Sequence, residues 1–242
     1  MSEPFKEVLY RNYLSTHSGH LYGKITFETI QKNFAVWDYY FSGHLPQTKD
    51  ADILDMGCGN GSFVYYLQQR GYRGVMGVDV SKQQIDEGIA LGITSIILSD
   101  IADFLRDKKI EFDCIIARDV IEHFTRQEVF DLIQMICAAL KPGGKFIMQV
   151  PNGQGLFYTS IYYGDYTHEM AYTESSVRQL FLNTGFSAST CYPTGPVPHG
   201  LKSKVRWLLW KVRIMIHRFW KMVETGNPGG IFTSNLIAVG VK

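Results

Sequence analysis

The amino-acid sequence predicts an α/β protein with a doubly wound sheet, and two observations lead to that fold class. From residue 51 onward, short runs rich in Ile and Val alternate with longer stretches whose apolar residues recur at helical spacing. Acidic residues and a glycine series stand where several of the short runs end, which is typical of the carboxyl edge of such a sheet. At 242 residues and 45% hydrophobic, the chain suits one domain that carries insertions.

The individual elements follow from these periodicities and from the residues that bound them. We expect buried parallel strands at Ala51–Asp55, Gly74–Val80, Ser95–Ser99, Phe112–Ala117 and Lys145–Val150, and further strands near Phe186–Tyr192 and at Ser234–Val241. We expect helices at Ser62–Arg70, Ser81–Leu91, Ile101–Lys108, Arg126–Leu140 and Thr173–Asn183. Three segments fall outside the pattern, namely residues 1–50, 151–172 and 193–230.

Composition narrows the classes of protein. The net charge of +1 gives no reason to expect a nucleic-acid partner. The four cysteines are far apart and indicate core thiols in a reducing compartment. The first residues lack the pattern of a signal peptide, and no apolar run approaches the roughly 20 residues that span a bilayer, so we expect a cytoplasmic protein.

A glycine series follows the first expected strand, as Gly57, Gly59 and Gly61. Glycine is needed where a strand turns sharply into a helix and the backbone lies against a ligand. The third glycine comes one residue too early for a dinucleotide-binding loop, and no phosphate-binding P-loop is present. Acids end the first three strands, as Asp55, Asp79 and Asp100. Carboxylates at this edge suit a ligand with ribose hydroxyls and a cationic tail, such as S-adenosylmethionine, better than a phosphate.

At these residues the chain resembles the class I S-adenosylmethionine-dependent methyltransferases. Ile53-Leu54-Asp55-Met56-Gly57-Cys58-Gly59-Asn60-Gly61 is similar to their first motif, Gly77-Val78-Asp79-Val80-Ser81 to their ribose-binding segment, and Leu140-Lys141-Pro142-Gly143-Gly144 to the turn before their fifth strand. The resemblance covers roughly residues 51–192. It implies a Rossmann-like, seven-stranded sheet whose last strand is antiparallel, and S-adenosylhomocysteine as product.

The resemblance also assigns cofactor-binding residues. It implies that Gly57 and Gly59 lie against the methionine tail, that Asp79 holds the ribose, and that Asp100 and Ile101 contact adenine. The remaining residues that we expect around the cofactor belong to the same matched segments or directly follow the fourth strand. They are Asp55, Cys58, Asn60, Gly61, Val80, Ser81, Arg118 and Asp119.

Two segments contain candidates for the general base that a hydroxyl acceptor would need. Glu122 and His123 follow the fourth strand; they either take part in the site or cap the next helix. Asp165 and His168 lie in the insertion after the fifth strand, where His168 is the candidate base and Asp165 its rival or orienting partner. The alternative is a solvated loop in which Asp165 and Thr167 cap a turn. Asp165 and His168 could also bind a metal, but no third ligand is evident, so we expect none.

The acceptor is indicated by fewer residues than the cofactor. Residues 13–17, 119–124, 164–169 and 231–236 together resemble bacterial methyltransferases associated with surface-polysaccharide synthesis, which implies a glycan or lipid-linked glycan as acceptor. That resemblance would place Tyr13 and His17 in an N-terminal helical lid, residues 1–50, over a methyltransferase domain, residues 51–242. Two other interpretations stay open: O-methylation of a small lipophilic acceptor such as a quinone precursor, and a non-catalytic cofactor-binding subunit that recruits a partner.

Residues 201–223 form a basic, tryptophan-rich segment with a continuous apolar stripe at helical spacing. Residues 202–221 contain seven Lys or Arg and no acid. This pattern predicts a helix that lies on an anionic membrane surface, at the inner face of the plasma membrane. Docking on its own domain, a homodimer contact and a channel for an anionic acceptor remain alternatives, and the oligomeric state, monomer or homodimer, stays open.

Overall fold

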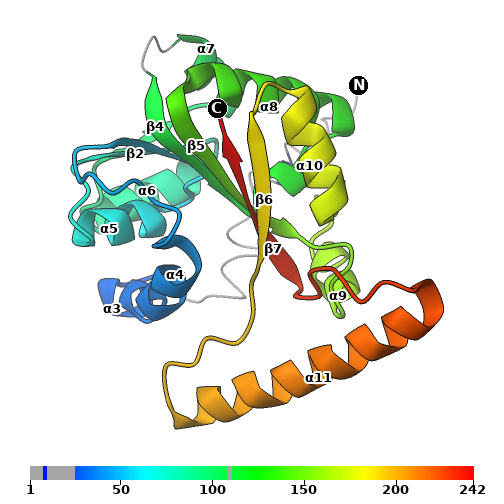
Figure 1. Ribbon diagram of the computed structural model, residues 1–242. Coiled ribbons are helices and arrows are strands. Elements are labelled where there is room, and N and C mark those ends of the chain that lie inside the picture. Colours follow the sequence, from blue (N-terminus) through cyan, green and yellow to red (C-terminus); the bar gives the residue numbers. More distant parts are fainter. Residues whose placement is uncertain (1–7, 10–24, 108–110) are drawn as a thin grey trace.

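The computed structural model describes residues 8–9, 25–107 and 111–242 (Figure 1). Its centre is a seven-stranded sheet in the order β3-β2-β1-β4-β5-β7-β6. The first five strands in the chain pair in parallel, and β7 is antiparallel to both of its neighbours, as the resemblance implied. The strands are β1 (Asp52–Met56), β2 (Gly74–Asp79), β3 (Ile96–Leu98), β4 (Phe112–Arg118), β5 (Leu140–Pro151), β6 (Ala188–Pro193) and β7 (Asn235–Val241).

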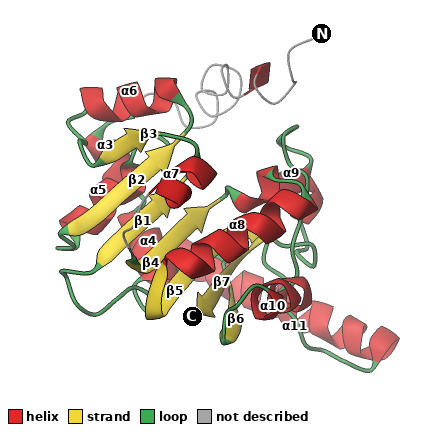
Figure 2. Ribbon diagram, turned by 90° about the horizontal axis from the view of Figure 1, so that it is seen from above, coloured by secondary structure: helices red, strands yellow, loops and turns green. Residues whose placement is uncertain are grey.

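Helices cover both faces of the sheet, and each face has its own hydrophobic core (Figure 2). One core is formed with α7 (Ile101–Asp107), α8 (Arg126–Ala139) and α10 (Glu174–Asn183). The other core is formed with α3 (Phe27–Gln31), α4 (Phe34–Phe41), α5 (Ser62–Gln69) and α6 (Lys82–Ala90). The doubly wound α/β fold is therefore confirmed, and the expected helices and strands agree with the observed ones to within a few residues.

Local sequence explains where the helices begin. Thr125 and Glu128 form a reciprocal capping box at the start of α8, since the Thr125 side chain accepts from the Glu128 amide while Glu128 accepts from that of Thr125. Thr173 caps α10 in the same way. Ser81 caps α6 by accepting a hydrogen bond from Gln84. These caps define the residues at which α6, α8 and α10 begin.

The described part of the predicted N-terminal lid packs against the sheet. Phe41 is fully buried and Leu45 nearly so, and both pack in the core beside β1 and α5. An ion pair between Asp38 and Arg70, 2.6 Å, further joins α4 to the residue that follows α5. The described part of residues 1–50 is thus a layer of the fold, because its aromatic side chains complete one core. Tyr13 and His17 lie outside the described residues.

Two further differences concern the ends of β5. The strand begins at Leu140 instead of Lys145, and its register with β4 shifts between Phe112 and Cys114, so that the Lys-Pro-Gly-Gly turn forms an irregular start of the strand. The insertion after β5 contains a short helix, α9 (Tyr158–Tyr162), that the sequence did not predict. The insertion after β6 contains α11 (Leu201–Thr225), which extends along the lower edge of the molecule in Figure 1.

Candidate functional site

The glycine loop after β1 adopts the strained turn that its sequence requires. Gly57, Gly59 and Gly61 have φ angles of 64°, 56° and 77°, in the left-handed region. A Cβ on Gly57 would also lie 2.4 Å from Cγ2 of Val120. The loop therefore packs against the segment that follows β4, two residues before Glu122.

Asp79 at the end of β2 holds this loop in place. Its carboxylate is buried and accepts hydrogen bonds from the backbone amides of Gly59, 2.8 Å, and Ser81, 2.7 Å. Asn60 accepts from the hydroxyl of Ser62 at 2.6 Å and so orders the start of α5. Cys58 is buried, and burial raises the pKa of its thiol, so this residue is a neutral packing group.

Asp55 is a carboxylate buried under the loop. It is 1% exposed, and Oδ2 has no hydrogen-bond partner among the described residues. Burial raises the pKa of Asp55 to about 6, against the opposing field of Arg118. The Arg118 guanidinium lies over the rings of Phe63, 4.1 Å, and Trp37, 5.1 Å, and thus reaches from β4 to the layer of α4 and α5.

Asp100 and Ile101, which we expect to contact adenine, lie at the start of α7 after the third strand. Asp100 is exposed and caps α7, since its Oδ1 accepts hydrogen bonds from Ala102, 2.8 Å, and Asp103, 3.1 Å. The Ile101 side chain packs in the core. Val80, between Asp79 and Ser81, is 49% exposed and is the apolar surface that β2 offers at this edge.

Asp119 joins three strand ends at the same edge. It has a φ of 56°, the only left-handed conformation of a described non-glycine residue. Its carboxylate accepts a hydrogen bond from Gln149 of β5, 2.8 Å, and another from Asn235 of β7, 3.4 Å. The strain and the three-strand bonding fix the direction in which the chain leaves β4 toward Glu122.

The two predicted catalytic segments come together. Glu122 and His123 lie in the 3-10 turn η2 (Ile121–His123), and the Glu122 carbonyl accepts a hydrogen bond from the amide of Glu169, 2.8 Å. The rings of His123 and His168 are 4.8 Å apart between centroids. Asp165, the fourth predicted residue, is buried in the same loop as His168. The two segments are more than 40 residues apart in the sequence, and the hydrogen bond between Glu169 and Glu122 joins them in the structure.

Hydrogen bonds orient both histidines. Thr167 Oγ1 lies 2.8 Å from Nδ1 of His123 and donates to Asp165 at 2.6 Å, so Thr167 links the His123 ring to the Asp165 carboxylate. Nδ1 of His168 lies 3.0 Å from the carbonyl oxygen of Tyr162 and donates to it. The sequence indicates only a capping role for Thr167 and no role for Tyr162. Tyr162 contributes through its backbone carbonyl, and no sequence motif identifies a contact of that kind.

Burial controls the charge of this cluster. Glu122 is 1% exposed, and desolvation together with the charges of Asp119 and Asp165 raises its pKa well above the usual range. Desolvation, reinforced by His168, lowers the pKa of His123 to about 4, so that its ring is neutral at neutral pH.

The structure brings together three side chains of metal-binding type, one more than the sequence indicates. One ligand atom from each of Glu122, His123 and His168 lies within 4.8 Å of the other two. In the sequence, only Asp165 and His168 are indicated as a pair of candidate ligands, without a third residue. Asp165 instead bonds to Thr167, which contacts His123, so its place is behind the histidines.

The helix α11 has two faces. Its more buried positions recur every three or four residues and are Ser203, Trp207, Trp210, Ile214, His217 and Lys221. This face packs on the domain, where the His217 ring lies 4.6 Å from that of Phe232. The apolar stripe is roughly on the other side at 100° per residue, and its members are exposed: Val205, Leu208, Leu209, Val212, Met215, Ile216, Phe219 and Met222. The sequence predicts that the Lys and Arg residues lie opposite the apolar stripe. In the structure, the face opposite the stripe is the docking face, which packs on the domain, and most of the Lys and Arg residues lie along the two edges of the stripe.

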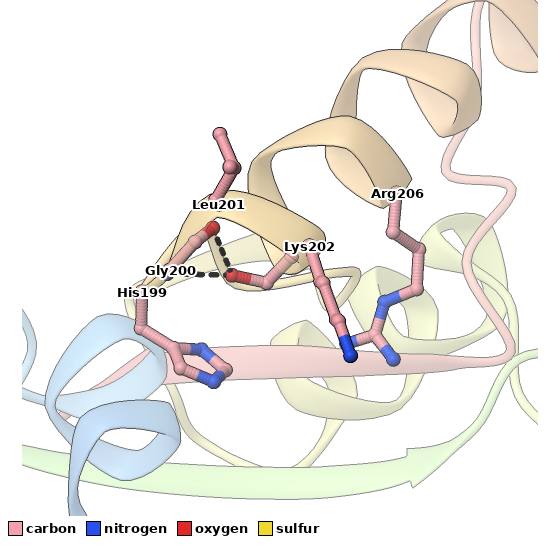
Figure 3. Close-up of a pocket in the computed structure, with 6 residues that line it drawn as sticks. His199, Gly200, Leu201, Lys202 and Arg206 are labelled. Atoms are coloured by element: carbon pink, nitrogen blue, oxygen red, sulfur yellow. Dashed lines mark hydrogen bonds between the residues drawn. The ribbon is translucent and has the colours of Figure 1, made fainter.

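A pocket lies at the start of α11 (Figure 3). It is lined by His199 and the first turns of the helix, where Ser203 Oγ accepts a hydrogen bond from Gly200 and donates one to its carbonyl. The side chains of Lys202 and Arg206 point to the same side as His199 in Figure 3. This pocket shares no lining residue with the cluster at the sheet edge.

The residues at the edge of β1 and β2 fit S-adenosylmethionine. The cradle at Gly57 has no room for a Cβ, and buried carboxylates lie at the ends of both strands. Carboxylates suit the ribose hydroxyls and the cationic amino-acid end of this cofactor, which has no phosphate. The seven-stranded fold and this donor set define an S-adenosylmethionine-dependent methyltransferase domain of class I.

The family follows from comparison with known proteins. Residues 32–190 match the family described as a methyltransferase domain, and the chain belongs to that family. An archaeal S-adenosylmethionine-dependent methyltransferase from Archaeoglobus fulgidus has the same fold, with a TM-score of 0.64, 16% identity, and coverage of 98% of this chain and 99% of that one.

Curated relatives have diverse acceptors. The mitochondrial ubiquinone biosynthesis O-methyltransferase of Dictyostelium discoideum is 25% identical over 62% of this chain and 52% of its own length. The tRNA U34 carboxymethyltransferase of Cellvibrio japonicus is 30% identical over 49% of this chain and 38% of its own. The chain thus spans about half or less of the length of these relatives.

Proposed function

We propose that the protein transfers a methyl group from S-adenosylmethionine to a hydroxyl oxygen of a glycan or lipid-linked glycan in surface-polysaccharide synthesis. One observation carries the hydroxyl assignment. The glycine loop packs on Val120, and Val120 leads directly into the cluster of Glu122, His123 and His168. Groups that accept or polarise a hydroxyl proton thus stand beside the cofactor cradle.

In the proposed reaction, some residues bind the cofactor and others accept the proton of the acceptor hydroxyl. Gly57, Gly59 and Asp79 hold the cofactor, which supplies a methyl group on a sulfonium and so needs no further activation. The acceptor oxygen must lie in line with that methyl group, and its proton must leave as the new C–O bond forms. His168 is oriented to accept that proton, because Nδ1 donates to Tyr162 and Nε2 is the nitrogen left with a free lone pair. Asp165 acts through Thr167 on His123 and is therefore a positioning residue.

The reaction is tested with labelled cofactor and two acceptor classes, lipid-linked glycans and a catechol-type quinone precursor. Transfer to the glycan supports the proposal. Transfer to the quinone precursor alone would replace it with the second candidate, which the similarity to the ubiquinone biosynthesis enzyme favours. His168→Ala is expected to lower kcat by about 10²- to 10⁴-fold while cofactor Kd stays unchanged. No methyl transfer by the unchanged chain to either acceptor class, together with unchanged biological function in His168→Ala and His123→Ala, would instead favour a non-catalytic recruiting subunit.

We also propose that α11 attaches the protein to an anionic membrane surface. Its apolar stripe is exposed, and at 100° per residue Lys204, Lys211 and Arg218 fall on one flank. Lys202, Arg206 and Arg213 fall on the other flank, which is the arrangement of a helix that lies in the plane of a membrane. The described helices include none that is long and apolar enough to cross a bilayer. The Arg213 guanidinium lies 4.3 Å from the Phe157 ring, so α11 is in contact with the insertion that contains His168.

Vesicle flotation tests the attachment. The whole chain should float with vesicles that contain phosphatidylserine as about one lipid in three and stay unbound with neutral vesicles. Leu209→Lys together with Phe219→Lys should abolish flotation, because two charges enter the stripe. A control with lysines at two exposed positions elsewhere, Gln69→Lys and Gln83→Lys, should float normally. Concentration-dependent dimerisation without flotation would assign the stripe to a second copy of the chain.

A further inference from the structure

Three side chains of metal-binding type meet where two loops join. Glu122 and His123 come from the turn after β4, and His168 comes from the loop between α9 and α10. The ligand atoms that they offer lie within 4.8 Å of one another. Backbone hydrogen bonds from Glu169 and Met170 to the Glu122 carbonyl, 2.8 and 3.3 Å, fasten the loops together.

The Glu122 carboxylate is the independent sign that a cation belongs here. It is 1% exposed, and neither of its oxygens has a hydrogen-bond partner among the described residues. Burial of an unpaired carboxylate costs several kcal/mol, so such a group needs a proton or a cation.

The two histidines are held as metal ligands usually are. Imidazole ligands keep their orientation because the second ring nitrogen bonds to a carboxylate, hydroxyl or carbonyl behind them. His168 bonds through Nδ1 to the Tyr162 carbonyl, so Nε2 is the ring nitrogen that would bind an ion. His123 bonds through Nδ1 to Thr167, and Thr167 bonds to Asp165.

We propose that Glu122, His123 and His168 bind one divalent transition-metal ion, of the Zn²⁺, Mn²⁺ or Co²⁺ type. Two imidazoles and one carboxylate are a common protein set for such ions and leave coordination positions open. Ligands about 2.1 Å from one ion lie roughly 3.4 Å apart in a tetrahedron, so the side chains need to approach by about 1 Å on binding. Rotations of the side chains suffice for a movement of that size.

The role of the ion rests on the proposed function. An open coordination position would bind the acceptor hydroxyl, lower the pKa of that hydroxyl and let its proton leave to water before the oxygen attacks the methyl group. The ion would then provide the activation that His168 would otherwise provide as a base. Binding of the ion does not depend on which acceptor the protein uses.

Titration with Co²⁺ and Zn²⁺ tests the site on the untagged full chain after treatment with a chelator. We expect one ion per chain, with the visible absorption of Co²⁺ in a nitrogen and oxygen site. Glu122→Gln, His123→Ala and His168→Ala should each weaken binding by at least about 100-fold, and Thr167→Val by about 10-fold, because it only orients His123. His199→Ala, a histidine outside the cluster, should bind as the unchanged chain does.

The possible results distinguish failure of the metal site from failure of the proposed function. Less than one ion per ten chains, or equal affinity in the three ligand variants, would overturn the metal site. Glu122→Gln guards against misfolding, since it removes a buried charge without changing shape and should not lower the melting temperature. Stoichiometric binding without methyl transfer to any acceptor would contradict the proposed function and leave the metal site standing. Methyl transfer at full rate in a chelator would overturn the role of the ion in activating the acceptor hydroxyl and leave the proposed function standing.

Discussion

Burial of the Asp55 carboxylate lowers the stability of the folded protein at neutral pH. Its pKa rises from 3.8 to about 6 on folding because burial disfavours the charged form. The folded state therefore holds the proton more tightly than the unfolded state. Stability that is present below pH 3.8 is lost as the pH rises to about 6, by at most roughly 3 kcal/mol.

Asp55→Asn should consequently raise the free energy of unfolding at pH 7.5 by about 2–3 kcal/mol and have little effect at pH 4. Urea unfolding at both pH values measures the difference. The exposed Asp103, which pairs with Arg106 on its own helix, is the control, and Asp103→Asn should change little at either pH. Equal effects of the two substitutions would contradict a special cost at Asp55. We expect the Asn variant to bind the cofactor less tightly, because a buried charge beside the cradle is gone.

Gly57 illustrates a second constraint at single-residue scale, in which conformation and space coincide. Gly57→Ala places a Cβ at a φ of 64° and 2.4 Å from Val120, so it should lower stability by about 1–3 kcal/mol and cofactor affinity by at least about 10-fold. Val120→Ala in the same chain should restore part of the loss, because it removes the clash and leaves the φ strain. Thermal unfolding and calorimetry measure both effects.

Gly43→Ala is the matched control for that substitution. A Cβ at Gly43 would meet no atom within 4 Å, and this residue is not among the described glycines with positive φ. It should leave both stability and cofactor affinity unchanged. A similar loss in both variants would show that the effect at Gly57 is not specific to the loop.

At the scale of elements, the two faces of α11 should respond differently to substitution. Trp210 lies on the docking face near Gly195, so Trp210→Ala should lower the free energy of unfolding by about 1–2 kcal/mol. Met215 is 64% exposed on the stripe, and Met215→Ser should change stability by less than about 0.5 kcal/mol. Denaturant unfolding separates these outcomes. A destabilising Met215→Ser would mean that the stripe is covered in solution, as in a dimer.

At the scale of the whole molecule, the cofactor couples to folding. A ligand that binds only the folded state stabilises it by about 2.7 kcal/mol at 100 times its Kd. For a chain of this size we expect S-adenosylmethionine and S-adenosylhomocysteine to raise the melting temperature by roughly 5–10 °C. NAD at the same concentration should give no shift, because the loop is not a dinucleotide loop. A shift with NAD alone would contradict the cofactor assignment.

The order of strands and helices could be read from the sequence because each element carries its own signal. Runs of Ile and Val mark strands that are buried on both faces, and Thr125 with Glu128 marks the start of α8. The short helix α9 carried no such signal, since its aromatic and polar residues lack helical periodicity. The position of α4 has no local signal for a different reason: Phe41 becomes a core residue only when α5 and β1 lie beside it.

The sequence by itself determined the glycine turn, the acids at the strand ends and the amphipathic character of α11, because each depends on residues close together in the chain. The tertiary structure alone decided that Glu122, His123 and His168 meet, that Thr167 joins Asp165 to His123, and which face of α11 packs on the domain. These contacts join residues far apart in the chain through backbone hydrogen bonds and burial. Spacing in the sequence contains no information about such distances. The sequence therefore indicated most of these residues as candidates but did not show that they form one cluster.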